Sequence, residues 1–115
     1  MTEFNISERQ IGDITIFDLN GDLIFGQGNV ALRTAIRQVL NEGRKKILLN
    51  FSDVGYVDSS GIGELISGFT AVNREDGQLK LLYLTTRIKY LLEITKLLTV
   101  FDTFETESNA LVSFK

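Results

Sequence analysis

The chain has 115 residues, enough for one domain and too few for two. It contains no Cys and no His, which excludes a disulfide framework, a thiolate nucleophile, a Cys-based metal site and a Ser–His–Asp triad built from this chain alone. The formal net charge of −3 argues against a nucleic-acid partner and against binding to an anionic membrane surface.

Targeting signals are not expected in this sequence. No apolar run approaches the roughly 18 residues of a transmembrane helix. The amino terminus carries Glu3 and Glu8 and lacks the apolar segment of a signal peptide. We therefore expect a cytoplasmic protein that binds neither nucleic acid nor membrane.

The first predicted element is a β-hairpin. β-Rich runs flank the turn signal Gly12–Asp13, and Asn20–Asp22 is expected to end the second strand. Residues 32–40 then carry apolar side chains at helical spacing. Asn29 is the predicted cap of this helix, and Gly43 is the predicted left-handed residue that ends it.

Two continuous apolar runs, 45–51 and 79–84, predict central strands, because strands buried on both faces do not alternate. Each is followed by a helical pattern, and the chain closes with a short edge strand and a short helix. These later elements are expected at residues 62–72, 85–95, 100–104 and 108–114.

The alternating order of strands and helices predicts an α/β fold. We expect one domain over residues 1–115, with a mostly parallel sheet of four to five strands and helices packed against it. The amino-terminal hairpin adds the antiparallel pair, and the connections between parallel strands are right-handed crossovers.

The segment after the first central strand holds the candidate functional residues. It is expected to be a loop that opens a helix, at the carboxyl end of a parallel strand, where open α/β sheets place their sites. A plain helix cap with a glycine that relieves the turn would also account for it. The segment reads Ser52-Asp53-Val54-Gly55-Tyr56-Val57-Asp58-Ser59-Ser60-Gly61-Ile62-Gly63-Glu64.

Two features of this segment indicate more than a cap. Gly61 and Gly63 each weaken a helix by roughly 1 kcal/mol relative to Ala, whereas small residues would let another molecule approach the backbone. Hydroxyls at the positive end of a helix also suit a phosphate, because free N–H groups and the helix dipole favour an anion. Phosphorylation would add about −1.5 to −2 charges beside Asp58 and would repel a partner docked there.

The chain resembles the STAS-domain family of anti-sigma factor antagonists over nearly its whole length. The resemblance rests on Leu19–Leu23, on Ile47–Phe51 leading into Val57–Gly63, and on Gly77–Leu81. A lone Asp-Ser-Ser-Gly is a weak signal. The flanking strand, the paired glycines and the order of elements make the match specific, and a STAS-like fold is what it implies.

The resemblance implies a protein that is a substrate and a ligand rather than an enzyme. Ser59, directly after the motif Asp, would be phosphorylated by a serine-kinase anti-sigma factor and restored by a PP2C-type phosphatase. The unphosphorylated form would bind the anti-sigma factor and free the sigma factor. No metal and no cofactor are expected, and the implied partner-binding residues are Asp22, Asp58, Ser59, Ser60, Gly61, Ile62 and Gly63.

The chain departs from the family pattern at two places. Family members often carry an acidic residue two positions after Asp22, where this chain has Ile24, and the following loop has one residue inserted. We expect Ile24 and Phe25 to be core residues, with a contact patch as the alternative; the altered loop bears on phosphorylation and on the partner's identity. Lys96 stands where many relatives have Gly, so a left-handed backbone there would be strained.

Three other interpretations remain open on the residues alone. Asp22, Asp53 and Asp58 could form a metal or general-acid site, although scattered loop carboxylates are more often caps and solvated turns. A small carboxylate-based hydrolase is disfavoured, because the chain has no base that titrates near neutral pH. A STAS module that is never phosphorylated, acting as a scaffold or accessory subunit of a signalling or transport complex, is the alternative function.

Overall fold

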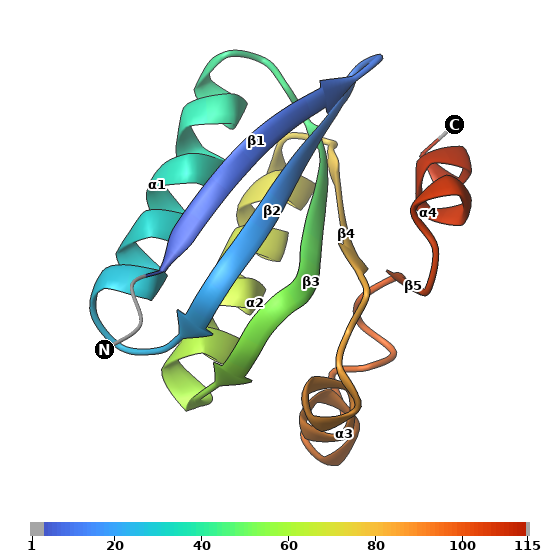
Figure 1. The fold of residues 1–115 in the computed structure, drawn as a ribbon. Coiled ribbons are helices and arrows are strands. Elements are labelled where there is room, and N and C mark those ends of the chain that lie inside the picture. Colours follow the sequence, from blue (N-terminus) through green and yellow to red (C-terminus); the bar gives the residue numbers. More distant parts are fainter. Residues whose placement is uncertain (1–3, 115) are drawn as a thin grey trace.

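The computed structural model describes residues 4–114, which build one five-stranded sheet and four helices (Figure 1). The strands lie in chain order; β1 is antiparallel to β2, and the other neighbours are parallel. This confirms the predicted α/β fold. The elements are β1 (Asn5–Ile11), β2 (Ile14–Leu23), α1 (Gln27–Asn41), β3 (Lys46–Val57), α2 (Ser59–Arg74), β4 (Gln78–Leu82), α3 (Thr86–Ile94), β5 (Thr103–Phe104) and α4 (Glu107–Ser113).

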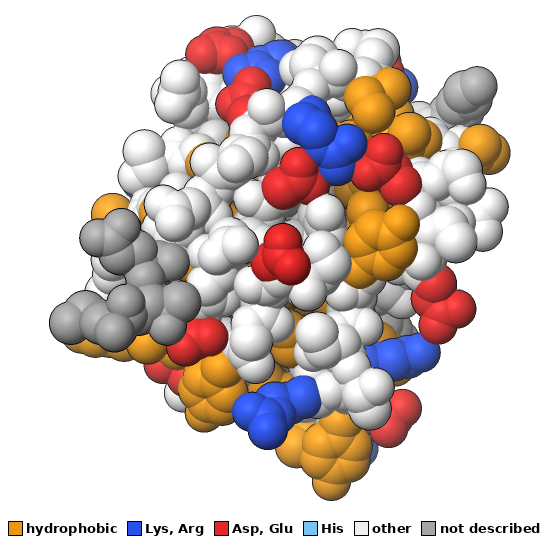
Figure 2. Space-filling view, in the orientation of Figure 1, with side chains coloured by type: hydrophobic (Ala, Val, Ile, Leu, Met, Phe, Trp, Pro, Cys, Tyr) orange, Lys and Arg blue, Asp and Glu red, His pale blue; other side chains and the backbone are white. Residues whose placement is uncertain are grey.

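The sheet has an apolar layer on each face. Because successive side chains of a strand point to opposite faces, Phe17 and Leu49 pack into the main core with α1, α2 and α3. Leu48 belongs to a smaller cluster that Phe114, at the end of α4, closes. Figure 2 looks onto the face of the sheet opposite α1 and α2.

Lys80 is buried in this smaller layer. Its Nζ donates to the Ser113 carbonyl at 2.9 Å and to the Ser113 hydroxyl at 3.0 Å, and it lies 4.9 Å from the centre of the Phe114 ring. The ammonium group therefore holds the carboxyl end of α4 against the sheet.

The predicted ends of the two longest strands are wrong. β2 passes through Asn20–Asp22 to Leu23, with Gly21 at a φ of 117° and an irregular register that absorbs the bend. β3 continues to Val57, so half of the expected loop is strand; Val54 and Val57 are buried between exposed neighbours.

The predicted start of the first helix is also wrong. The cap of α1 is Gly26, and Asn29 lies inside the first turn, buried against α2. Its predicted end is confirmed, since Gly43 follows the helix at a φ of 79°. The edge strand is shorter than expected, because only Thr103–Phe104 pair with β4. No helix within residues 4–114 combines the length and apolar character that a membrane crossing requires.

Candidate functional site

Two segments far apart in sequence meet at one end of the sheet. Leu23 and Val57, the last residues of β2 and β3, are register partners, and the Asp58 N–H donates to the Leu23 carbonyl at 3.3 Å. The chain then opens α2 directly and opens α1 after a short loop (Figure 1). The amino ends of both helices therefore border the carboxyl ends of both strands.

Asp58 organises this end of the molecule as the cap of α2. Its Oδ1 accepts from the Gly61 N–H at 2.8 Å and from the Ser60 hydroxyl at 2.6 Å, and its Oδ2 accepts from the Phe25 N–H at 3.3 Å. The Ser60 hydroxyl, followed by the Gly61 N–H, holds the pKa of Asp58 below its ordinary value. The carboxylate is thus ionised at neutral pH and committed to structure.

The two adjacent serines have different environments. The Ser60 hydroxyl donates to Asp58 and accepts from Asn29 Nδ2 at 2.8 Å. The Ser59 side chain is exposed and makes no hydrogen bond to another described side chain or backbone group. Of the two hydroxyls, only that of Ser59 is free to react.

The paired glycines do not share one role. A Cβ at Gly61 would overlap the Leu23 carbonyl oxygen and lie 2.9 Å from Val57 Cγ1, so the helix end packs directly on the strands. The close approach that the sequence assigned to a second molecule is therefore made, at Gly61, by this chain itself. A Cβ at Gly63 would meet nothing within 4 Å, so only Gly63 leaves its backbone open to a partner.

The remaining predicted site residues divide in the same way. Ile62 is buried in the core, at 7% exposure, whereas Asp22 is partly exposed at the end of β2. Asp22, Asp53 and Asp58 share this end of the sheet. Within residues 4–114, however, no group of three or more such side chains is arranged to hold a metal ion.

The loop between β2 and α1 contradicts one expectation. Ile24 is 38% exposed and Phe25 is 84% exposed, so neither is a core residue. The chain leaves the core after Leu23, and Gly26, at a φ of 104°, turns it into α1. Of the two alternatives for this loop, only a contact patch fits the observed exposure.

Sequence reasoning missed two contacts that join α1 to α2. Asn29 donates to Ser60, and one turn further on Arg33 pairs with Glu64, at 2.6 Å from Nη2 to Oε1 and 3.2 Å from Nε to Oε2. In each helix the two residues are four positions apart, so they lie on one face. Asn29 is only 6% exposed, and this buried amide fixes the Ser60 hydroxyl.

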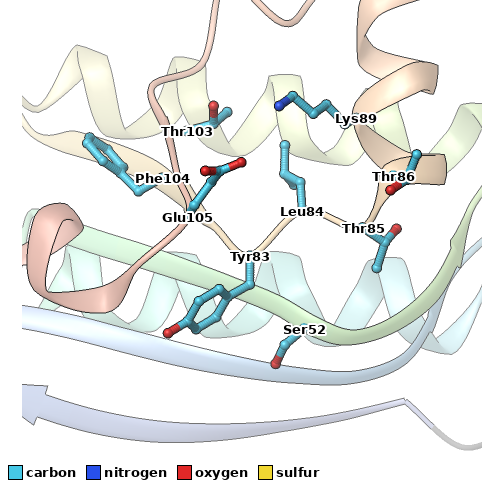
Figure 3. Close-up of a pocket in the computed structure, with 9 residues that line it drawn as sticks. All are labelled: Ser52, Tyr83, Leu84, Thr85, Thr86, Lys89, Thr103, Phe104 and Glu105. Atoms are coloured by element: carbon cyan, nitrogen blue, oxygen red, sulfur yellow. The ribbon is translucent and has the colours of Figure 1, made fainter.

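A shallow, open cavity of about 710 Å³ lies elsewhere on the molecule, over Ser52 in the middle of β3, the residues that follow β4, and β5. Figure 3 shows Tyr83 and Ser52 on one side of the β4 backbone, with the Tyr83 hydroxyl pointing away from Ser52, and Lys89 and Glu105 on the other side. These polar groups do not converge on one point, so the cavity does not have the arrangement of a catalytic centre.

Comparison with known proteins relates this chain to one family. A family model described as the STAS domain matches residues 5–110. An anti-sigma factor antagonist homolog of Thermotoga neapolitana is 29% identical over 101 residues, which are 88% of this chain and 89% of that protein. The anti-sigma-B factor antagonist of Staphylococcus aureus is 33% identical over 66 residues, 57% of this chain and 61% of that protein.

One solved structure extends the comparison to three dimensions. The Bacillus cell fate determinant SpoIIAA in its phosphorylated form superposes with a TM-score of 0.75, over 96% of this chain and 100% of that chain. The sequence identity is 18%, so this likeness concerns the fold alone.

Proposed function

The chain belongs to the STAS domain family, and we propose that it is an anti-sigma factor antagonist whose binding is controlled by phosphorylation of Ser59. In its unphosphorylated form it binds a serine-kinase anti-sigma factor and so releases the sigma factor. A PP2C-type phosphatase restores this form. The chain itself is not an enzyme, carries no cofactor or metal, and acts in the cytoplasm beside its ATP-using partner.

The free Ser59 hydroxyl is the observation that carries this proposal. It is exposed at the first position of α2, while the neighbouring Ser60 hydroxyl is held between Asp58 and Asn29. A kinase must bring a hydroxyl in line with the terminal phosphate of its nucleotide, which requires a side chain that can leave the surface. Ser59 meets that requirement, whereas Ser60 would first have to break two hydrogen bonds and leave the cap.

The same geometry gives phosphorylation a large local effect. A phosphate on Ser59 adds about −1.5 to −2 charges directly beside the ionised Asp58. A repulsive contact at a partly desolvated interface is worth a few kcal/mol, and about 1.4 kcal/mol changes an affinity tenfold.

The relatives support the proposal by their names. The matched proteins of Thermotoga neapolitana and Staphylococcus aureus are called anti-sigma factor antagonists, and the Bacillus protein of the same fold has been solved in a phosphorylated form. The residues proposed to contact the partner around Ser59 are Asp22, Asp58, Ser60 and Gly63, with Gly61 and Ile62 shaping the helix end from within.

Binding of the purified serine-kinase anti-sigma factor from the organism that encodes this chain tests the proposal. Calorimetric titration should give Ser59→Ala an affinity within about threefold of the wild type and weaken Ser59→Asp at least about 100-fold. Ser67→Asp, at another exposed serine of α2, is the matched control and should bind normally. Equal affinities of Ser59→Ala and Ser59→Asp would overturn the switch and favour an unmodified scaffold.

A further inference from the structure

We propose that Phe25 anchors the contact with the partner, by entering an apolar pocket that Lys or Arg side chains of the partner border. This inference rests on the proposed function, because it assumes a protein docked at the amino end of α2. It adds the residue that selects the partner, which the motif around Ser59 does not specify.

Phe25 is the most exposed large apolar side chain among the described residues, at 84%. Ile24 beside it is 38% exposed, and Tyr56, next to the register partner of Leu23 on β3, is 47% exposed. We call these three residues the apolar tip. A single exposed apolar side chain is ordinary, but three at the end of two neighbouring strands form a surface suited to binding.

The backbone holds Phe25 in this position. Its N–H donates to Asp58 Oδ2 at 3.3 Å, and Gly26 follows at a φ of 104°, which favours glycine. A Cβ at Gly28 would lie 2.8 Å from the Asp22 carbonyl oxygen, so the next turn packs closely on β2. A ring on a fixed loop loses little freedom on binding, and aromatic anchors of this kind dominate binding energy at interfaces.

Charge around the apolar tip indicates the chemistry of the partner. Asp22 and Asp53 lie at the same strand ends, and no ion pair within residues 4–114 includes either of them. The lower left of Figure 2 shows hydrophobic side chains with acidic side chains above them and a basic side chain to their right. An apolar centre with an acidic rim is complementary to an apolar pocket with a basic rim.

The anchor is also connected to the switch. Asp58 caps the helix that begins with Ser59 through Oδ1 and holds the Phe25 N–H through Oδ2. A phosphate on Ser59 therefore acts on the same carboxylate that positions the anchor. The Phe25 amide resonance should shift when Ser59 is phosphorylated, while that of Tyr90, on the distant helix α3, should not.

The test compares anchor and switch variants against the same purified serine-kinase anti-sigma factor. Phe25→Ala should weaken binding at least about 30-fold. Phe25→Leu should weaken binding less, since it keeps an apolar side chain. Tyr90→Ala is the matched control, because Tyr90 is 62% exposed on α3, and it should stay within twofold of the wild type. Asp22→Asn with Asp53→Asn should reduce the salt dependence of association.

The outcomes separate the inference from the proposed function. Wild-type affinity of Phe25→Ala, together with loss of binding by Ser59→Asp, would overturn the anchor and leave the switch intact. Loss of binding by Phe25→Ala, together with normal binding of Ser59→Asp, would support the anchor and overturn the switch. Because Phe25 is exposed, Phe25→Ala should keep the melting temperature of the wild type, so weaker binding cannot be attributed to unfolding.

Discussion

Replacing Gly61 by Ala probes how α2 is seated on the sheet. The added methyl would overlap the Leu23 carbonyl oxygen and approach Val57 Cγ1 to 2.9 Å. Neither group can move freely, since Leu23 and Val57 are fully or almost fully buried and pair with each other between β2 and β3. The strain must therefore displace the helix end or the strand ends.

The magnitude follows from two opposing effects. Overpacking of a dense interior costs about 1–3 kcal/mol, and contact with a fixed backbone oxygen places Gly61→Ala near about 3 kcal/mol. Ala gains roughly 1 kcal/mol in helix propensity over Gly, so the expected net loss is about 2 kcal/mol. Gly63→Ala makes no new contact within 4 Å and should gain about 1 kcal/mol.

Urea denaturation followed by circular dichroism measures both variants. The same substitution, two positions apart on one helix, should separate the free energies of unfolding by about 3 kcal/mol, with the denaturant slope unchanged. Equal stability of Gly61→Ala and Gly63→Ala would refute the claim that the motif glycine is required by the packing of α2 on β2.

Three further predictions concern stability. The Arg9 guanidinium, then the Asn50 amide, lowers the pKa of Asp18. The ionised Asp18 therefore stabilises the folded protein fully above about pH 4, and this stabilisation is lost as the pH falls through the pKa of Asp18 in the folded state. Asp18→Asn should make the free energy of unfolding depend less on pH in urea titrations between about pH 5 and 2. Lys80→Met should cost about 1–3 kcal/mol by removing both hydrogen bonds to Ser113, and should speed hydrogen exchange in α4 first. Lys96 has a φ of 61°, so Lys96→Gly should raise the free energy of unfolding by up to about 1 kcal/mol, measured by thermal denaturation.

Each of these three has a contradicting result. An acid dependence of Asp18→Asn that parallels the wild type would show that Arg9 does not stabilise the ionised carboxylate. Unchanged exchange in α4 would show that Lys80 does not hold this helix. A loss of stability in Lys96→Gly would show that the left-handed backbone there is not strained.

The helices could be predicted because their signals are local. Leu32, Ile36 and Val39 are apolar and stand at helical spacing, and all three lie on the buried face of α1. Gly43 was expected to be left-handed from its place after a helix, and its φ of 79° agrees. For Lys96 the sequence predicted strain if the backbone were left-handed, and its φ is 61°.

The strand ends could not be predicted from the same signals. Beyond Phe51, the buried residues Val54 and Val57 each follow two exposed residues, and this three-residue spacing does not match the two-residue alternation of a strand. Whether such a segment pairs depends on its neighbour, and here β2 extends alongside it to Leu23. The sequence alone does not reveal that partnership.

Local chemistry predicted part of the candidate site's geometry. A helix cap among Asp58, Ser59 and Ser60 and exposed hydroxyls at the helix start were expected; in the structure Asp58 is the cap and Ser59 is the exposed serine. The contact between Asn29 and Ser60 joins residues 31 positions apart and depends on how α1 packs against α2. Phe25 is apolar and was expected inside, but the core ends at Leu23, and the loop leaves the ring in water.

Phosphotransfer to the purified chain tests the central claim most directly. The chain should be incubated with ATP and the serine-kinase anti-sigma factor, the modified residue identified by tandem mass spectrometry, and the product titrated against the same kinase. The account predicts one phosphate, on Ser59 and not on Ser60, and a product whose affinity is at least about 100-fold weaker. A phosphate on Ser60 with Ser59 unmodified, or a phosphorylated product that binds as tightly as the unmodified chain, would contradict it.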